Sequence, residues 1–331
     1  MSSRALVTGG AGFIGSHLAE GLLDRDWQVD ALDDLSTGSV ENVEHLSKRP
    51  GFAFTLGSAM DWDTVAPLVA TADVVFHLAA AVGVRLVVEQ PVHTIHTNIG
   101  TTETVLALAA ERRSRVLLAS TSEVYGKLDG HRFSENDDVV LGPTSRSRWS
   151  YAASKIIEEF LGIAYARERG IPVTIMRLFN TIGPRQTGQY GMVVPRFVQQ
   201  ALQGEPLTVY GDGTQRRSFT WVGDVVNAML ALVQHPGAIG EVFNLGHTKD
   251  IEIRELAGLV KELTHSDSDI THVEFEQVYE SGFEDLPRHL PNISKIERLI
   301  GYRPTLDLTE MLERIIRHMR AEAPASKAPA A

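Results

Sequence analysis

The feature that most constrains the fold is a glycine-rich loop near the amino terminus, TGGAGFIG, at residues 8–15. A short apolar stretch precedes the loop, and apolar residues at helical spacing follow it. Glycines in this pattern allow a tight turn, close approach of the backbone to a diphosphate and close packing of a helix on a strand. A tight turn without a ligand is the alternative. The pattern predicts a dinucleotide site formed by Gly9, Gly12, Phe13, Ile14 and Gly15.

An acidic residue, Asp33, supports the dinucleotide interpretation. It lies eighteen residues after Gly15, at the end of a second predicted strand at residues 27–32. A carboxylate about 20 residues beyond the glycines binds the ribose of the adenosine half of a dinucleotide. No arginine directly follows Asp33 to receive a 2′-phosphate, so the sequence favours NAD over NADP.

Strands alternate with helices through the first half of the chain. Strands are expected at 5–7, 27–32, 52–56, 74–78, 115–119 and 173–178, and helices at 101–112 and 151–169. Such alternation predicts an α/β fold with a Rossmann-type, doubly wound parallel sheet. We expect an NAD-binding domain at 1–179, to which 222–250 return. A smaller C-terminal substrate-binding lobe is expected at 180–221 and 251–320, and a disordered tail at 321–331.

Composition and charge narrow the function. The chain has 331 residues and a net charge of -11 without a long basic run, which argues against a nucleic-acid partner. It has no cysteine, which excludes disulfides, thiolate zinc sites and a cysteine nucleophile, and no metal site is expected. No apolar run approaches the ~18 residues of a membrane span, and no signal segment opens the chain, so we expect a cytoplasmic protein.

A tyrosine and a lysine are spaced for proton transfer. Tyr151 and Lys155 lie four residues apart at the start of a predicted helix, which stacks them on one face. We expect the lysine ammonium, with the positive nicotinamide nearby, to lower the pKa of the tyrosine. The phenolate would then accept the proton of a substrate hydroxyl. The alternative is a packed tyrosine and a solvated lysine.

The segments TGGAGFIG, HLAAA at 77–81, STSEVYG at 120–126 and YAASK at 151–155, together with Asp33, resemble the extended short-chain dehydrogenase/reductase family over nearly the whole chain. Members oxidise C4 of a nucleotide sugar and reduce it again with the same tightly bound, recycled NAD. His77 is interpreted as a hydrogen-bonded, partly buried histidine, and Asn98 is expected to open a helix. The resemblance adds the cofactor contacts Ser58, Ala59, Leu78, Ala79, Ala80, Asn98, Tyr151 and Lys155.

Later segments resemble the nucleotide-sugar lobe of that family. Planar guanidinium groups suit a diphosphate, although each arginine could also form a surface ion pair. Arg85 could meet a substrate carboxylate or be a plain surface charge. Ser58 stands where many relatives have an acid for the adenine, and Asp61 could substitute for it. The implied substrate contacts are Arg85, Asn180, Arg185, Val194, Arg196, Tyr210, Arg217 and Arg288.

The residues of the STSEVYG segment distinguish which reaction a member of the family catalyses. By the family pattern, Thr121 hydrogen-bonds the 4-oxygen of the sugar. Ser122 replaces the aspartate that 4,6-dehydratases use as an acid, and Glu123 is a carboxylate that 4-epimerases do not need. The segment resembles the UDP-glucuronate decarboxylase (UDP-xylose synthase) branch, as do RSRWSY at 146–151 and ESGFED at 280–285.

Oxidation of C4 turns a glucuronate into a β-keto acid, which loses CO₂ readily, and re-reduction gives UDP-xylose. Whether Glu123 transfers a proton, orders a water or acts through its charge stays open. The alternatives are a UDP-hexose or UDP-hexuronate 4-epimerase and, remotely, a non-catalytic nucleotide-sugar sensor. The resemblance also implies a homodimer formed through the helices at 101–112 and 151–169. The predicted catalytic residues are Thr121, Ser122, Glu123, Tyr151, Lys155 and Arg217.

Overall fold

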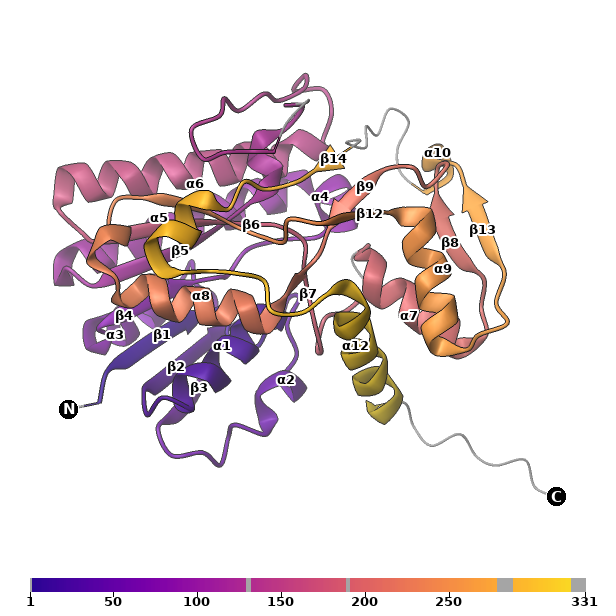
Figure 1. Ribbon diagram of the computed structural model, residues 1–331. Helices are drawn as coiled ribbons and strands as arrows, with labels where there is room; N and C mark the ends of the chain where they lie inside the picture. Colours follow the sequence, from indigo (N-terminus) through magenta and orange to yellow (C-terminus); the bar gives the residue numbers. More distant parts are fainter. Residues whose placement is uncertain (1, 129–131, 189–190, 279–287, 323–331) are drawn as a thin grey trace.

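A seven-stranded parallel sheet forms the centre of the computed structural model, which describes residues 2–128, 132–188, 191–278 and 288–322 (Figure 1). The strands that follow the glycine loop pair on both sides of β1, so the sheet is doubly wound as predicted. In spatial order the strands are β11 (Val242–Leu245), β6 (Val173–Leu178), β5 (Arg115–Thr121), β4 (Val74–His77), β1 (Arg4–Thr8), β2 (Gln28–Asp33) and β3 (Phe52–Leu56).

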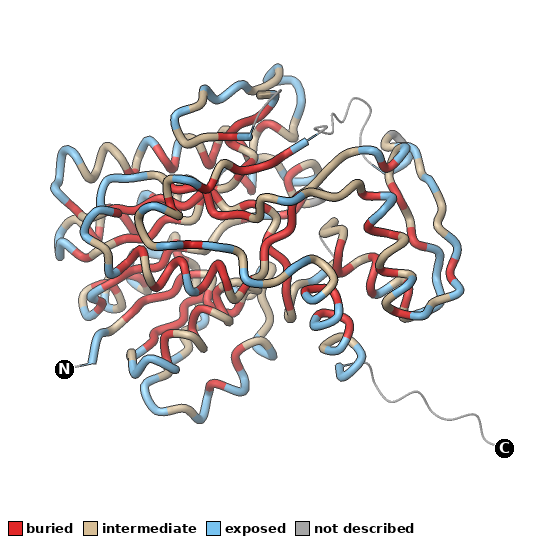
Figure 2. The backbone as a smooth tube through the Cα atoms, in the orientation of Figure 1, coloured by how far each residue is buried: buried red, intermediate tan, exposed pale blue. Residues whose placement is uncertain are grey.

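Helices cover both faces of this sheet, because its strands are apolar on both sides. One face packs against α1 (Phe13–Leu23), α8 (Val222–Gln234) and α11 (Ser294–Ile300). The other packs against α3 (Trp62–Thr71), α5 (Pro91–Arg112) and α6 (Arg148–Arg169). Figure 2 shows the strands as a buried layer between these helices.

A smaller lobe lies to the right in Figure 1 and has its own apolar core. Its helices are α7 (Val193–Gln203), α9 (Ile253–Thr264) and α12 (Leu308–Glu322). Strands β8 (Leu207–Tyr210) and β13 (Ile270–Val273) pair, and β9 (Arg216–Ser218) lies between β12 (Asp250–Glu252) and β14 (Arg288–His289). The short elements are α2 (Glu41–Glu44), α4 (Val84–Glu89), α10 (Phe275–Val278), β7 (Thr181–Ile182), β10 (Thr220–Trp221), η1 (Ser122–Tyr125) and η2 (Pro236–Ala238).

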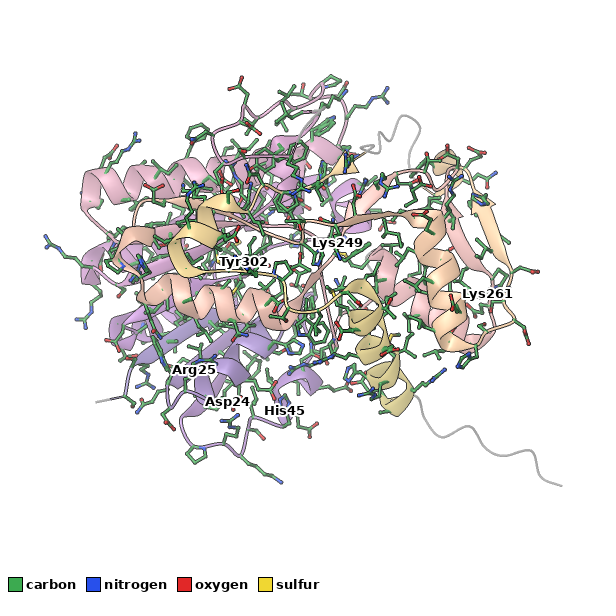
Figure 3. The ribbon with its side chains drawn as sticks, in the orientation of Figure 1. Asp24, Arg25, His45, Lys249, Lys261 and Tyr302 are labelled. Atoms are coloured by element: carbon green, nitrogen blue, oxygen red, sulfur yellow. The ribbon has the colours of Figure 1, made fainter. Side chains whose placement is uncertain are left out.

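The chain between α11 and α12 fastens the lobe to the sheet. Tyr302, labelled in Figure 3, donates its hydroxyl to the carbonyl of Gly246 at 3.2 Å. Thr305 donates its N–H and hydroxyl to the carboxylate of Asp224 on α8, at 2.9 and 2.6 Å. These contacts hold the segment that leads into α12 against α8 and the end of β11.

Several predicted boundaries differ from the structure. Helix α5 begins at Pro91, whose fixed φ suits a first helical position, so the prediction that Asn98 opens the helix is wrong. Helix α12 continues through Glu322, so the tail predicted from 321 starts too early. Residues 323–331 and the segment at 280–285 lie outside the described residues. Among the described helices, none has the length and apolar character needed to cross a membrane.

Candidate active site

The glycine loop is tightly packed where β1 meets α1. Gly9 has φ +70, and a Cβ atom there would lie 2.9 Å from the backbone nitrogen of Ala79, just after β4. A Cβ atom on Gly15 would overlap the carbonyl oxygen of Gly9. Glycine is therefore required at both positions by backbone approach, as the sequence pattern predicts.

The start of α1 is open to an anionic ligand. No side chain caps the helix at Gly12, and its first turn, all within the described residues, carries no acid. The amide groups at the start of the helix suit a pyrophosphate. The carboxylate of Asp33 accepts the N–H groups of Ala11 at 2.9 Å and Leu35 at 2.8 Å, and its remaining lone pairs suit ribose hydroxyls. Burial raises the pKa of Asp33. These residues fit NAD.

The loops after β3 and β4 complete the cradle. Ser58 accepts the N–H of Met60 at 3.2 Å, and Ala59 beside it is buried. Asp61 accepts the hydroxyl of Thr64 at 2.6 Å and caps α3, which gives this acid a structural role. The half-buried residues Leu78, Ala79 and Ala80 follow β4 beside the glycine loop.

Asn98 supports this cradle from behind. Its side-chain oxygen accepts the N–H of Ala81 at 2.7 Å, and its amide nitrogen donates to the hydroxyl of Ser154 at 3.1 Å. The residue is fully buried in α5. Asn98 therefore ties the loop after β4 to α6, the helix that carries Tyr151 and Lys155.

Thr121, Glu123 and Tyr151 meet at the carboxyl end of β5. Thr121 is the last residue of this strand, and its hydroxyl oxygen accepts the N–H of Glu123 at 3.3 Å. A hydrogen bond also joins Thr121 and Tyr151. Ser122 is buried under this turn. A substrate oxygen placed at Thr121 would therefore lie beside the phenol.

Positive groups surround Glu123. Its carboxylate receives a guanidinium N–H of Arg148 at 3.1 Å, and the imidazole of His289 lies 3.8 Å away. Partial burial raises the pKa of Glu123, but His289, Arg148 and Arg217 outweigh this effect and lower it. The carboxylate is therefore ionised near neutral pH.

The pKa of Tyr151 differs from the prediction. Burial raises it, and the negative charges of Glu158 and Glu123 raise it further, while Thr121 opposes them. Lys155 donates to the carboxylate of Glu158 at 2.7 Å, so its charge is paired. Without the nicotinamide charge that the prediction also invoked, burial and then Glu158 and Glu123 outweigh any lowering by Lys155, so the predicted lowering is wrong for this arrangement.

Part of the predicted substrate set lies in the smaller lobe. The guanidinium of Arg196 stacks 3.9 Å above the ring of Tyr210 and donates to the carbonyl of Thr208. The amide of Asn180 donates to the carbonyl of Ser218 on β9, next to Arg217. Val194, however, is 1% exposed and belongs to the core of the lobe.

The structure does not bring Arg185 or Arg288 to the cluster around Glu123. Arg185 pairs with Glu20 of α1 at 2.8 Å and donates to the carbonyl of Asn42 at 3.1 Å. Arg288 pairs with Asp250 at 2.6 Å, and its side chain is 55% exposed. The side chain of Arg85 lies outside the described residues.

Sequence reasoning missed Arg148 and His289. Arg148 precedes Tyr151 by three residues in α6, a spacing that places both on one side of the helix. His289 follows Arg288 in β14, and successive strand residues point to opposite faces. These two spacings are the signals that could have identified them.

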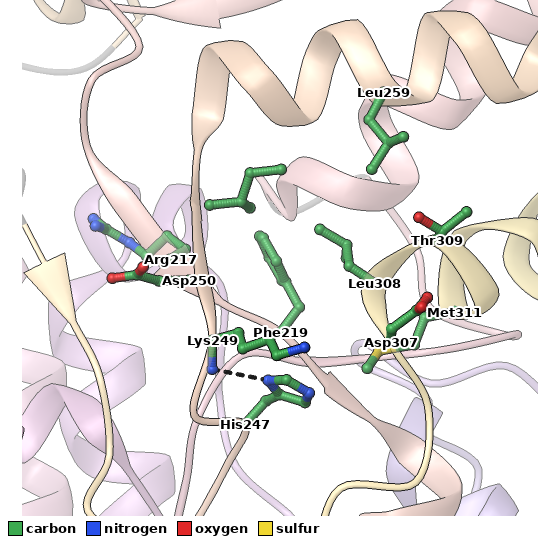
Figure 4. A pocket seen from close by; sticks show the side chains of 11 residues that line it. Arg217, Phe219, His247, Lys249, Asp250, Leu259, Asp307, Leu308, Thr309 and Met311 are labelled. Atoms are coloured by element: carbon green, nitrogen blue, oxygen red, sulfur yellow. Dashed lines mark hydrogen bonds between the residues drawn. The ribbon is translucent and has the colours of Figure 1, made fainter.

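A cavity of about 300 Å³ lies between β9, β12, α9 and the start of α12 (Figure 4). His247, whose ring accepts the N–H of Lys249 at 3.0 Å, and Phe219 line it. Arg217 lies at its edge with its guanidinium pointing away from the middle. Neither Glu123 nor Tyr151 lines this cavity, so it is distinct from the reactive cluster.

The glycine loop, Asp33 and the Tyr151–Lys155 pair define a dinucleotide-dependent enzyme of the doubly wound class. The family model for the NAD dependent epimerase/dehydratase family matches residues 5–246, and the chain belongs to this family. A UDP-N-acetyl-alpha-D-glucosaminuronate decarboxylase from Bacillus cytotoxicus is 43% identical over 97% of this chain and 98% of its own length. UDP-glucuronic acid decarboxylase 1 from Xenopus tropicalis is 37% identical over 96% of this chain and 72% of its own length.

Solved structures of the family share the whole architecture. A UDP-glucuronic acid 4-epimerase from Bacillus cereus, in complex with UDP-glucuronic acid and NAD, has a TM-score of 0.87 and 29% identity, over 96% of this chain and 99% of that one. A UDP-glucose 4-epimerase from Thermotoga maritima has a TM-score of 0.86 and 29% identity over the same shares. The chain thus has the fold of solved 4-epimerases and sequence relatives that are named decarboxylases, so the site must distinguish the two reactions.

Proposed function

We propose that this protein is an NAD-dependent UDP-glucuronate decarboxylase, a carboxy-lyase that oxidises C4 of the sugar and removes C6 as CO₂. The observation that carries the proposal is the ionised Glu123, held by Arg148 beside Thr121 and Tyr151. A 4-epimerase needs no carboxylate at this place. The similarity to two proteins named as hexuronate decarboxylases supports the same conclusion.

The first task of the site is oxidation of C4. The glycine loop and Asp33 would hold NAD, which would supply the hydride acceptor for C4 and the hydride donor for the later reduction. The phenolate form of Tyr151 accepts the proton of the 4-hydroxyl as a general base, and Thr121 orients the same oxygen. Lys155 lies on the same helical face, and Glu158 holds its ammonium group in place. The product of this step is a 4-ketone adjacent to the carbon that bears the carboxylate.

The second task is cleavage of the bond between C5 and C6. The bonding electrons pass into the C4–C5 enolate as CO₂ leaves, and Thr121 and the protonated Tyr151 stabilise the developing oxyanion. Glu123 faces this region as a negative charge and disfavours a carboxylate kept at C6. A proton then adds to C5, and reduction of the ketone gives UDP-xylose, whereas early release gives the 4-keto sugar.

Mass spectrometry of reactions with a small panel of nucleotide sugars tests the proposal. UDP-glucuronate should yield a UDP-pentose lighter by one CO₂, without added NADH if the cofactor stays bound and is recycled. A product of unchanged mass, UDP-galacturonate, would instead establish a 4-epimerase. No conversion of any sugar would favour a nucleotide-sugar sensor.

The panel must include UDP-N-acetylglucosaminuronate, because the 43% identical relative is named for that substrate. The two sugars differ only at C2, whereas the chemistry runs through C4, C5 and C6. Both would therefore decarboxylate by the same steps, and the ratio of kcat/KM values measures which substituent the site accepts.

We also propose the domain division and the dimer. Residues 1–179 with 222–250 would bind NAD, and 180–221 with 251–320 would bind the nucleotide sugar. In α5 and α6, Val92 and Phe160 are 80% and 67% exposed, which suits pairing with a second copy. Light scattering should show that the unmodified chain is a dimer and that the Phe160→Glu variant is a monomer. A monomeric unmodified chain would refute the dimer. A cytosolic location stays a prediction.

A further inference from the structure

A buried chain of hydrogen bonds connects Lys155 with the strand before the glycine loop. Lys155 and Thr102 both donate to one carboxylate oxygen of Glu158, at 2.7 and 2.9 Å. His77 contacts Thr102 with one ring nitrogen at 3.0 Å and Thr8 with the other at 2.8 Å. Glu158 is 1% exposed and His77 is 1% exposed, so water does not screen this chain.

The donors and acceptors fix the direction of every bond. The hydroxyl proton of Thr102 goes to the carboxylate of Glu158, so its oxygen must accept from Nε2 of His77. Nδ1 of His77 then accepts the hydroxyl proton of Thr8. The hydroxyl oxygen of Thr8 in turn receives the N–H of Ala79 at 3.3 Å. The chain is thus consistent with one tautomer of a neutral histidine.

We propose that Glu158 is a positioning residue for the reaction. It holds the Lys155 ammonium group in place and ties it, through Thr102 and His77, to the strand end that carries the cofactor cradle. The proposal rests on the proposed function only in that Tyr151 and Lys155 act as a pair. One carboxylate oxygen of Glu158 accepts both hydrogen bonds, and the other is buried with no hydrogen-bond partner among the described residues, so the whole group lies in the protein interior.

Glu158 also places a second negative charge beside Tyr151. Four other charged or titratable groups surround Tyr151 and Glu158. They are Lys155 and Glu159 on α6, Glu123 on η1 and His77 on β4. Burial and then Lys155 lower the pKa of His77 to about 3, so this ring is neutral and adds no charge. Burial has the largest effect in raising the pKa of Tyr151, and the negative charge of Glu158 has the second largest. Removing its charge should make Tyr151 easier to ionise.

The test is a Glu158→Gln variant, which keeps the shape and can still accept from Lys155 and Thr102. Tyrosinate absorbance is followed as pH rises, as the difference between each protein and its Tyr151→Phe counterpart. We expect the titration midpoint of Tyr151 in Glu158→Gln to fall by about one pH unit. The low-pH limb of the kcat profile should also move to lower pH by about one unit, so kcat at a fixed pH on that limb should rise about tenfold.

Glu159→Gln is the matched control, because Glu159 is the next residue of α6 and is also buried. Glu159 binds Arg177 at 2.7 Å and Ser120, and it does not bind Lys155. Its replacement should therefore lower thermal stability but leave the Tyr151 absorbance midpoint and the low-pH limb of kcat unchanged. A Glu158→Gln protein that folds and titrates like the unmodified chain would overturn the proposal.

Thr102→Val is a second variant, in case Glu158→Gln does not fold. It removes the hydrogen bond that orients the Glu158 carboxylate and, through it, the Lys155 ammonium group, so kcat should fall about tenfold while KM for the sugar stays unchanged. An unchanged kcat in this folded variant would count equally against the proposal. The absorbance titration needs no substrate, so it is independent of whether the sugar product is the one proposed.

Discussion

Two glutamates flank Tyr151 and have opposite environments. Glu123 is 36% exposed and sits among Arg148, His289 and Arg217, which lower its pKa. Glu158 is 1% exposed, and burial raises its pKa although Lys155 opposes this. One carboxylate is partly exposed at the carboxyl end of β5, and the other lies in the protein interior.

This contrast shows that glutamate has two different roles beside the phenol of Tyr151. Several cations keep Glu123 charged where the reacting carbons would lie. A single ammonium and a hydroxyl hold Glu158 where no substrate can reach it. The environment, rather than the residue type, assigns each role. Variants can separate the two sides of Tyr151.

Tyr151→Phe should have the largest effect, because it removes the group on which both glutamates act. We expect turnover to fall about 10³-fold, within the range for loss of a general base. Activity is measured by CO₂ release, and NAD binding by calorimetry should be retained. Unchanged turnover would contradict the role of Tyr151.

Glu123→Gln affects only the substrate-facing side. We expect C4 oxidation to survive and CO₂ release to slow about 10²-fold, which corresponds to about 2.7 kcal/mol in the barrier of that step. Rapid-quench analysis should show the reduced cofactor accumulating before CO₂ appears. Equal loss of both steps would mean that Glu123 is only structural.

Arg148→Met removes a positive partner of Glu123 but leaves the carboxylate of Glu123 in place. Loss of this partner should raise the pKa of Glu123, because Arg148 lowers it both by its charge and by its hydrogen bond. The low-pH limb of CO₂ release should therefore move to higher pH, with about a tenfold loss at the acid end. Arg146→Met, two residues before it and exposed, is the control and should leave the limb in place.

His77→Gln probes the interior side and should have the smallest effect at neutral pH. His77 has a folded pKa of about 3 against 6.5 in the unfolded chain, so the unfolded chain binds the extra proton. Stability is full above pH 6.5 and falls as pH drops toward 3, at about 1.4 kcal/mol per pH unit. Glutamine can make both hydrogen bonds and should flatten this slope. An unchanged slope of urea-unfolding free energy against pH would show that His77 does not stay neutral.

The sequence predicted the sheet, the glycine loop and the Tyr151–Lys155 pair, because local spacing determines each of them. It did not predict where the arginines point. Arg288 and His289 are adjacent in β14, and only the pairing of β14 with β9 decides which of them faces Glu123. Pairing between segments some 70 residues apart has no local signal in one sequence.

The interior of the site was predicted only in part. His77 was expected to be hydrogen-bonded and partly buried, and it is almost completely buried with two hydroxyl partners. Glu158 was overlooked, because its partner Thr102 comes from another helix, 56 residues away. Helical spacing shows that Lys155 and Glu158 are neighbours, but it does not show that a third element buries both.

The late position of β14 has a consequence for synthesis. Every strand of the main sheet is complete once residue 245 has been made, and the glycine loop and Tyr151 belong to that part. His289 and its strand emerge afterwards. Because domains fold as they leave the ribosome, the nucleotide cradle can form on a nascent chain whose Glu123 cluster is still incomplete. A chain that terminates before 288 would thus contain every residue of the cofactor cradle and lack His289 of the reaction centre.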